Sequence, residues 1–365
     1  MSTPVSGFHN LWNFSRMLAD VGNKLTGAVN NAGQKPTGAQ TPTPVTQQPT
    51  DAYQPSRAER VNNLRTQLAN DPAAQRALEH MDTGGRLSRK GVLDQLERLG
   101  NSPELLGQTV KDLAHPGKMR QGVDNKFCAQ TDALSHMARQ DPAGYARMMA
   151  DLSTKGSAQV KNGVTLNAQK DLDPSAMGSM TATQRLAAPA LAEYANGAGM
   201  EVDAKGVSHA TDGRKTDRTV QGTVSTGMER MQQALVGHDW DSQYISDSKK
   251  NHAASVSSAV DTIHDNLKKG EDPSVSRNGH WFNVTGFRAT PDGGRMTVTD
   301  PLTGESKTVN ARHFLNNAEA VTFDKTDLSQ KGGGGMPTQT ELARPKHERP
   351  GGGGKIGASS NPVED

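Results

Sequence analysis

Apolar residues recur at helical spacing between residues 58 and 115. One stripe, preceded by Ser88 as a candidate cap and followed by Gly100, consists of Val92, Leu93, Leu96 and Leu99. A second stripe follows Ser102-Pro103-Glu104 and stops near residues 115–117. Since side chains three and four positions apart share one helix face, both patterns predict amphipathic helices. We therefore expect residues 58–117 to form a small helical region.

Strand patterns appear late in the chain. Residues 280–287 and 296–299 are rich in β-branched and aromatic residues, and Pro291-Asp292-Gly293-Gly294 between them favours a turn. The two segments predict a hairpin that sets Phe282 opposite Asp300, with His280 on the diagonal. Residues two apart on a strand share a face, so these three side chains are expected on one side of the sheet.

The segment between these regions is mostly helical in pattern. Residues 200–222 are polar and Gly-rich, which predicts an exposed loop or hairpin. Helical patterns cover residues 127–139, 142–152, 183–194, 228–235 and 256–267.

Composition changes at both ends of the chain. Residues 32–55 are almost uncharged and consist mainly of Gln, Thr, Pro, Gly and Ala, and two Gly runs fill residues 332–335 and 351–354. Such segments bury too little apolar surface to offset the entropy lost on ordering. We expect a disordered leader over residues 1–57 and a disordered tail over residues 331–365.

The leader contains one amphipathic stretch, between Phe8 and Leu25. It lacks the basic start and unbroken apolar run of a secretory signal peptide. An uncleaved leader rich in Ser, Thr, Pro and Gln resembles the N-termini of type III secreted effectors. That resemblance implies a protein secreted and translocated into a host or target cell, with a secretion chaperone as partner. An ordinary tail with a partner-binding helix, in a cytoplasmic protein, is the open alternative.

Charge, hydropathy and cysteine content limit the classes of binding partner and the compartment that the sequence favours. The chain has 41 Lys and Arg against 39 Asp and Glu, without a basic block, which argues against nucleic acid. No apolar run approaches the roughly 20 residues that span a bilayer, so we expect no stable membrane insertion. One cysteine excludes an intramolecular disulfide and fits a reducing compartment, or export followed by delivery into one.

Metal or cofactor binding is not expected from the sequence. The histidines are scattered, without a His-x-x-x-His pair or a second cysteine near any of them. His238-Asp239-Trp240-Asp241 is dense in polar groups, but no other segment is linked to it by spacing.

The candidate chemistry begins at Cys128, which starts the predicted helix over residues 127–139. A lone cysteine is more often a small buried apolar residue. At a helix N-terminus beside an imidazolium, however, a thiol ionises readily and becomes a nucleophile. His136 lies on the same helix, about 12 Å further along its axis, and is therefore excluded as the base. His280 and Asp300 on the hairpin supply that base and the group that orients it.

Two motifs resemble a known family. They are Gly279-His280-Trp281-Phe282-x-Val284-Thr285-Gly286-Phe287 and Asp300-Pro301-x-x-Gly304. They are similar to the His and Asp motifs of papain-like cysteine peptidases, and closest to bacterial branches that include bacteriocin-leader-processing peptidases and YopT-type effector proteases. The resemblance covers roughly residues 118–323 in arrangement.

This resemblance implies an α+β fold, with a helical subdomain whose nucleophile helix packs on an antiparallel sheet, over a catalytic domain of residues 118–330. Cys128 would be the nucleophile, His280 the base and Asp300 its orienter. The family places an oxyanion-stabilising Gln about six residues before the nucleophile. Gln121 lies seven before Cys128, and Asn125 is a rival donor.

The implied activity is that of a cysteine protease acting on a protein or peptide. A glutamine deamidase or transglutaminase would use the same three residues. A catalytically inactive papain-like module, serving as a binding or adaptor protein, is the alternative from a different class.

Overall fold

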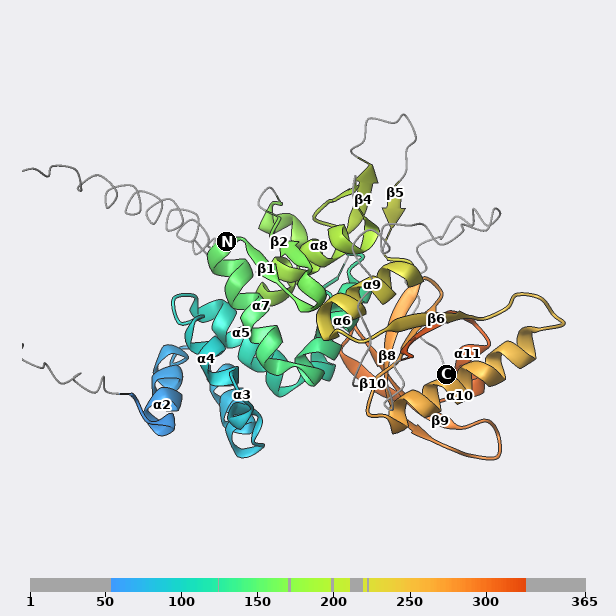
Figure 1. Ribbon diagram of the computed structural model, residues 1–365, viewed down its shortest axis with the longest axis horizontal. Coiled ribbons are helices and arrows are strands. Elements are labelled where there is room, and N and C mark those ends of the chain that lie inside the picture. The colour runs from blue at the N-terminus through green and yellow to red at the C-terminus, as the bar shows by residue number, and fades with distance from the viewer. Residues whose placement is uncertain are drawn as a thin grey trace, which may run out of the picture. The chain divides into compact units, whose positions relative to one another are not determined.

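The computed structural model describes residues 54–325, apart from residues 124, 170–171, 198–199, 211–218 and 222 (Figure 1). All its helices and strands belong to one compact unit that begins at Pro55. The predicted tail, and the predicted leader up to residue 53 with its amphipathic stretch, lie outside the described residues.

Helices α2 to α5 occupy the region predicted to be helical. Ser56 and Glu59 form a capping box that starts α2, and Asp71 caps α3 through the backbone N–H of Ala74. The elements are α2 (Arg57–Gln67), α3 (Pro72–Thr83), η1 (Arg86–Ser88), α4 (Val92–Glu97), α5 (Pro103–Ala114) and η2 (Pro116–Lys118).

The predicted cap of α4 is wrong. Ser88 lies inside the short η1 turn, and α4 begins instead after Gly91, whose φ of 82° is left-handed. Glycine adopts that conformation without the steric cost that a Cβ brings, so the chain turns into α4 at Gly91.

Five more helices follow, and the first four of them share one apolar core with α2 to α5. This core runs from Val61 on α2 through Leu134 and Met137 to Trp281. The N-terminal helices and the helix that begins with Cys128 therefore stabilise each other by common burial. The five helices are α6 (Cys128–Gln140), α7 (Pro142–Lys155), α8 (Ala182–Asn196), α9 (Ser225–Val236) and α10 (His252–Lys268).

The main sheet is antiparallel and has six strands in the order β10-β9-β8-β7-β11-β6. Its presence beside the helices confirms the α+β class. The strands are β6 (Trp240–Tyr244), β7 (Ser274–Arg277), β8 (His280–Arg288), β9 (Arg295–Asp300), β10 (Glu305–Asn310) and β11 (Ala318–Asp324), with α11 (Ala311–Leu315) between the last two.

Adjacent residues of β8 enter different cores, since side chains alternate across a strand. Trp281 belongs to the core shared with α6, while Phe282 and Val284 belong to a second core with residues of α10 and α11. The sheet thus lies between helix α6 and the pair α10–α11. Figure 1 shows α10 and α11 beside the sheet strands.

The predicted hairpin register is confirmed at the end of the hairpin that contains His280 and Asp300. Asn283 pairs with Thr299 and Val284 with Val298, so one residue further along Phe282 faces Asp300. A bulge between Val284 and Gly286, which the sequence did not predict, shifts the remaining pairs by one residue.

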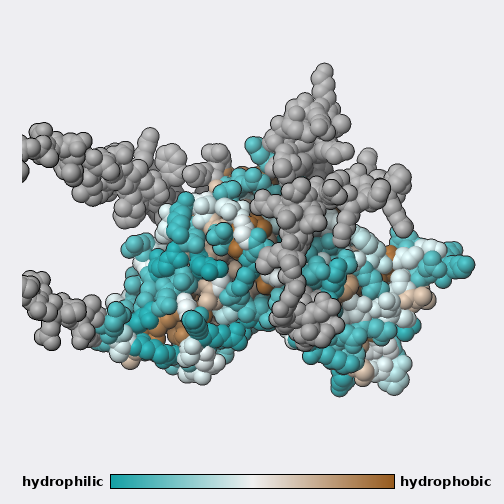
Figure 2. Space-filling model, viewed as in Figure 1, coloured by the Kyte–Doolittle hydropathy of each residue, from teal (hydrophilic) through white to brown (hydrophobic). Residues whose placement is uncertain are grey.

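Two smaller sheets complete the described part. Residues 200–222, predicted as a loop or hairpin, contain three short strands, β3 (Met200–Val202), β4 (Val207–Ala210) and β5 (Thr219–Gln221). The other sheet pairs β1 (Ser157–Gln159) with β2 (Thr165–Asn167). Among the described helices none has the length and apolarity to cross a bilayer. Figure 2 shows a mostly hydrophilic visible face with scattered apolar residues.

Candidate active site

Cys128 is held at the first position of α6 by the loop before it. Phe127 is fully buried in a small core with Met177 and Met180, which anchors the helix start. The side-chain oxygen of Asn125 accepts a hydrogen bond from the backbone N–H of Phe127 at 3.2 Å. Cys128 itself is 6% exposed, so its sulfur lies just below the surface.

The same loop is tied to the end of β9. The backbone N–H of Gln121 donates to the carbonyl of Pro301 at 2.8 Å. Gly304, with a φ of 68°, lies so close to the loop that an added Cβ would stand 3.0 Å from the Lys118 carbonyl. Glycine at this position of the Asp-Pro-x-x-Gly motif therefore permits the loop before Cys128 to pack against the turn after Asp300.

His280 begins β8 directly after a tight turn, in which Asn278 and Gly279 have φ values of 53° and 70°. Its Nε2 lies 2.8 Å from Oδ1 of Asp300, at the end of the neighbouring strand β9. The ring of Phe282 packs edge-on against the imidazole at 4.9 Å, on the face of the strand that parity predicts. The same Asp300 oxygen accepts the backbone N–H of Leu302 at 2.8 Å, which fixes the carboxylate.

Cys128 is the second side chain that acts on His280, and it favours the protonated imidazole. Burial lowers the pKa of His280, but the hydrogen bond to Asp300 and the interaction with Cys128, together with the charges of both, outweigh it and raise the pKa to about 10. Burial favours neutral Asp300, yet the hydrogen bonds from His280 and Leu302 keep the pKa of this carboxyl below its ordinary value. The imidazole is therefore protonated at neutral pH and lies between two acidic partners.

The three predicted residues thus come together from three separate elements. With Nε2 occupied by Asp300, Nδ1 is the nitrogen left to serve the thiol. A protonated imidazole beside a thiol stabilises the thiolate, which is the nucleophilic form of cysteine. The side chains of His280 and Asp300 are 24% and 26% exposed, so a substrate has access to one side of this group.

Both predicted oxyanion donors lie in the loop before Cys128, and both are buried. The side-chain amide of Asn125 donates to the Gln121 carbonyl at 2.6 Å, so Asn125 uses both ends of its amide to shape the loop. The amide of Gln121 donates to the Asn125 carbonyl at 3.2 Å. The side-chain oxygen of Gln121 has no hydrogen-bond partner in the described part of the chain.

A second cluster of titratable groups lies further along α6. His136 is fully buried between Glu271 and Asp272, 3.7 Å and 4.0 Å from their carboxylate oxygens. His238, Glu271 and Asp324 also converge there. Its place on the same helix as Cys128 excludes His136 as the base, and no sequence spacing links it to the other residues of this cluster. The only signal in the sequence was the dense polar segment that begins with His238.

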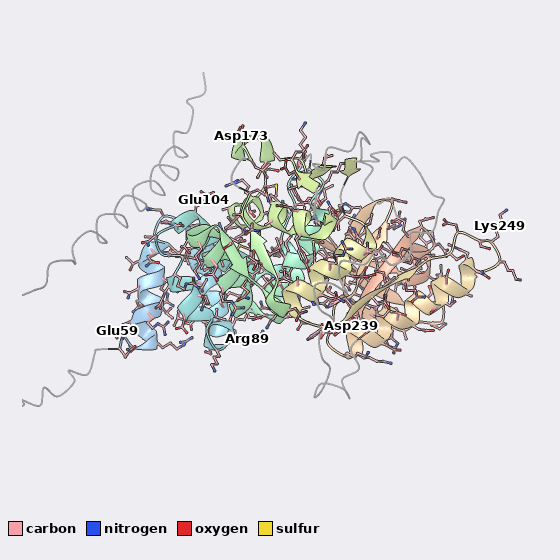
Figure 3. The ribbon with its side chains drawn as sticks, turned by 45° about the horizontal axis from the view of Figure 1, so that its top comes forward. Glu59, Arg89, Glu104, Asp173, Asp239 and Lys249 are labelled. Carbon is pink, nitrogen blue, oxygen red and sulfur yellow. The ribbon has the colours of Figure 1, made fainter. Side chains whose placement is uncertain are left out.

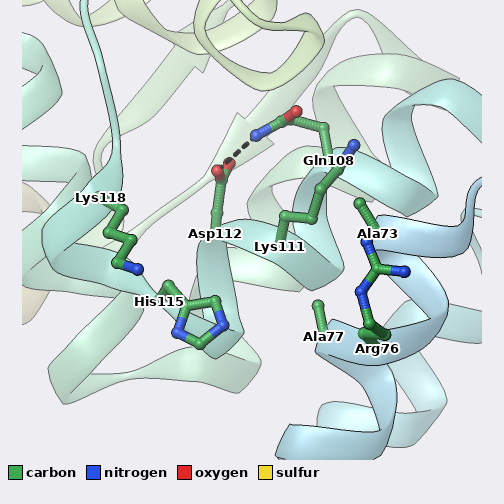
Figure 4. Close-up of a pocket in the computed structure, with 8 residues that line it drawn as sticks. All are labelled: Ala73, Arg76, Ala77, Gln108, Lys111, Asp112, His115 and Lys118. Carbon is green, nitrogen blue, oxygen red and sulfur yellow. Dashed lines mark hydrogen bonds between the residues drawn. The ribbon is translucent and has the colours of Figure 1, made fainter. Parts of the chain in front are cut away.

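A separate hollow of about 390 Å³ lies between α3 and α5, away from the thiol (Figure 4). Its rim carries several cationic side chains, and Lys111 among them pairs with Asp71. The buried carboxylate of Asp112, one of its lining residues, accepts hydrogen bonds from Gln108, Tyr145 and Thr183. Its lining residues are Ala73, Arg76, Ala77, Gln108, Lys111, Asp112, His115 and Lys118.

Comparison of the chain with family models, curated proteins and solved structures finds no match.

Proposed function

We propose that this protein is a papain-like cysteine hydrolase that cleaves peptide bonds in a protein or peptide substrate. The single observation that carries the proposal is that His280 is hydrogen-bonded to Asp300 while Cys128 acts on the same ring. A thiol beside an imidazole that is oriented by a carboxylate is the arrangement that thiol catalysis uses.

In the proposed mechanism, the Cys128 thiolate attacks the carbonyl carbon of the scissile bond. The carbonyl oxygen takes up the negative charge as the tetrahedral intermediate forms. His280 then gives its proton to the departing amine, the C–N bond breaks, and an acyl-thioester remains on Cys128. Water attacks this thioester while His280 takes a proton from it, and breakdown of the second intermediate releases the acid and restores the thiolate.

The start of α6 supports the charge on the oxyanion. The first backbone N–H groups of a helix have no carbonyl partner within the helix, and the helix dipole places positive potential there. We assign the side-chain donor to Gln121 rather than Asn125. The Asn125 amide is committed at 2.6 Å to the loop backbone, whereas the Gln121 amide makes a longer bond of 3.2 Å.

Asp300 orients rather than reacts. Its hydrogen bond at 2.8 Å fixes the ring of His280 and stabilises the imidazolium. Because Leu302 also binds this carboxylate, the turn after β9 positions the ring through a rigid backbone contact. Delivery of the enzyme into a target cell belongs to the same proposal and rests on the composition of residues 1–57.

A peptide-library digestion tests this function and separates it from its rivals. The full chain is incubated with peptides derived from a whole proteome, and the products are compared by mass spectrometry with those of Cys128→Ala. New peptide termini that appear only with the wild type would support the protease. A gain of about 1 Da at glutamine would instead identify a deamidase, and glutamine–amine crosslinks a transglutaminase. No difference between the two proteins would contradict catalysis and favour an adaptor.

A further inference from the structure

His238, Glu271 and Asp324 offer three ligand atoms that all lie within 4.8 Å of one another. Nδ1 of His238 is 2.9 Å from an oxygen of Asp324 and 3.5 Å from an oxygen of Glu271. A zinc ion with ligands at 2.0–2.2 Å in tetrahedral geometry holds them about 3.3 Å apart. The observed separations bracket that spacing, and one imidazole with two carboxylates is a ligand set that zinc accepts.

The cluster is assembled from one strand end and two loops that lead into strands of the main sheet. His238 precedes β6, Glu271 lies between α10 and β7, and Asp324 ends β11. Figure 3 labels Asp239, the neighbour of His238, near α9. Asp324 is 2% exposed and the Glu271 side chain 8%, while the His238 side chain at 28% gives access from solvent. Buried carboxylates at such a site favour a bound cation.

His136 supplies an independent observation. Its side chain has no exposed surface, and neither ring nitrogen has a hydrogen-bond partner in the described part of the chain. Nε2 points at the second oxygen of Glu271, at 3.7 Å. The ring of Trp240, edge-on at 5.1 Å, holds it there. A fully buried imidazole without a hydrogen bond, directed at a carboxylate cluster, is in the orientation of a metal ligand.

The neighbouring carboxylate of Asp272 is already matched by a cation, because Arg139 pairs with it. Glu271 faces both His136 and His238.

We propose that His238, Glu271 and Asp324 bind one divalent metal ion of the zinc class, with His136 as the adjacent nitrogen donor. Binding releases the proton that His238 Nδ1 and Asp324 share, and the nitrogen and oxygen bind the metal in its place. The ion would join α6, which starts with Cys128, to the strands that lead to His280. Its role is therefore structural: it braces the two elements whose contact forms the candidate active site.

Isothermal titration calorimetry with ZnCl₂ tests the proposal on the full chain after treatment with a chelator. The Cys128→Ala background is used because the thiol, His280 and Asp300 are themselves possible ligands. We expect one site per chain, with a rise of several degrees in the unfolding temperature under excess zinc. Cobalt(II) bound at the same site should show the absorption of a tetrahedral ion.

Variants decide where the metal binds. Asp324→Asn and Glu271→Gln should each weaken binding about 100-fold, and His136→Phe at least about tenfold. Circular dichroism checks that each variant is folded, and His264→Ala, outside the cluster, should bind zinc as the background does. Absence of stoichiometric binding would overturn the proposal. Equal affinity in the folded Asp324→Asn and Glu271→Gln variants would do the same. Neither result bears on peptide cleavage, which is measured separately.

Discussion

Two histidines lie against acidic side chains where α6 meets the main sheet. Their surroundings shift the pKa values of the two rings in opposite directions. The pKa of His280 is raised to about 10, while that of His136 is lowered to about 3. Burial disfavours the charged form of both. His280 overcomes it through a hydrogen bond of 2.8 Å to Asp300 and the contact with Cys128. His136 has carboxylates only at 3.7 Å and 4.0 Å, so burial prevails.

The comparison shows how one residue type serves two purposes. His280 is held in the protonated form that a leaving group needs, and His136 in the neutral form that a metal needs. Protonated His280 stabilises the fold below an unfolded-state pKa near 6.5, and this contribution is lost as pH rises through about 10. For His136 the unfolded state binds the extra proton, so stability is lost as pH falls from about 6.5 toward 3.

The largest effect is expected from a change in the set of Cys128, His280 and Asp300. Cys128→Ala removes the nucleophile, so turnover of any peptide substrate should fall at least about 1,000-fold. The change deletes one sulfur atom near the surface, and we expect the free energy of unfolding to change by no more than about 1 kcal/mol. Steady-state kinetics and urea unfolding measure the two effects. An Ala variant with comparable turnover would exclude Cys128 as the nucleophile.

Gln121→Ala should reduce turnover about 100-fold, the usual cost of losing one oxyanion donor. The rate at which iodoacetamide alkylates Cys128 should stay unchanged, because that reaction forms no oxyanion. Gln159→Ala, at an exposed position of strand β1, is the control and should affect neither rate. Loss of alkylation together with turnover would show that Gln121 shapes the thiol site instead.

Asp300→Asn keeps an oxygen for the Leu302 N–H but removes the negative charge beside His280. The pKa of His280 should fall, and alkylation of Cys128 at pH 6 should slow about tenfold. Asp292→Asn, in the exposed turn of the same hairpin, is the control. An unchanged pH dependence in Asp300→Asn would mean that the carboxylate does not influence the thiol.

The second cluster is tested through stability rather than chemistry. In the presence of a chelator, the free energy of unfolding should decline as pH falls below 6.5, by up to about 1.4 kcal/mol per pH unit for one proton. His136→Phe should flatten this decline and leave thiol alkylation intact, whereas His313→Phe should retain it. Urea unfolding from pH 4 to 7 gives the slopes. If the free energy of unfolding had the same pH slope in the wild type and in His136→Phe, the lowered pKa of His136 would be contradicted.

Much of the fold follows from local pattern. Apolar periodicity predicted the long helices, and the paired strand segments predicted the register at Asp300. The bulge at Gly286 was not predictable, because it depends on how the strand fits its neighbour. A Cβ on Gly286 would meet the Thr297 side chain at 3.3 Å, a contact that only the folded sheet creates. The start of α4 at Gly91 was missed because Ser88 offered a competing local cap.

The sequence predicts the residues of the Cys128 site but not those of the cluster around His136. His280 and Asp300 lie on one hairpin, so strand parity links them to each other, and the helix start singles out Cys128. His136, His238, Glu271 and Asp324 come from four separate segments, one helix, one strand and two loops, with no fixed spacing between them. Only the tertiary packing of α6 on the sheet brings them together, and no rule based on sequence spacing detects such a set.

The most direct test of the central claim is the pH dependence of Cys128 alkylation in the wild type and in His280→Ala. Cys128 is the only cysteine, so no other thiol contributes. We expect the wild type to react readily at pH 6 and His280→Ala to be slower there by on the order of 100-fold. The two rates should converge near pH 10, where His280 loses its proton. Superimposable profiles that rise about tenfold per pH unit toward the ordinary thiol pKa near 8.5 would contradict the account.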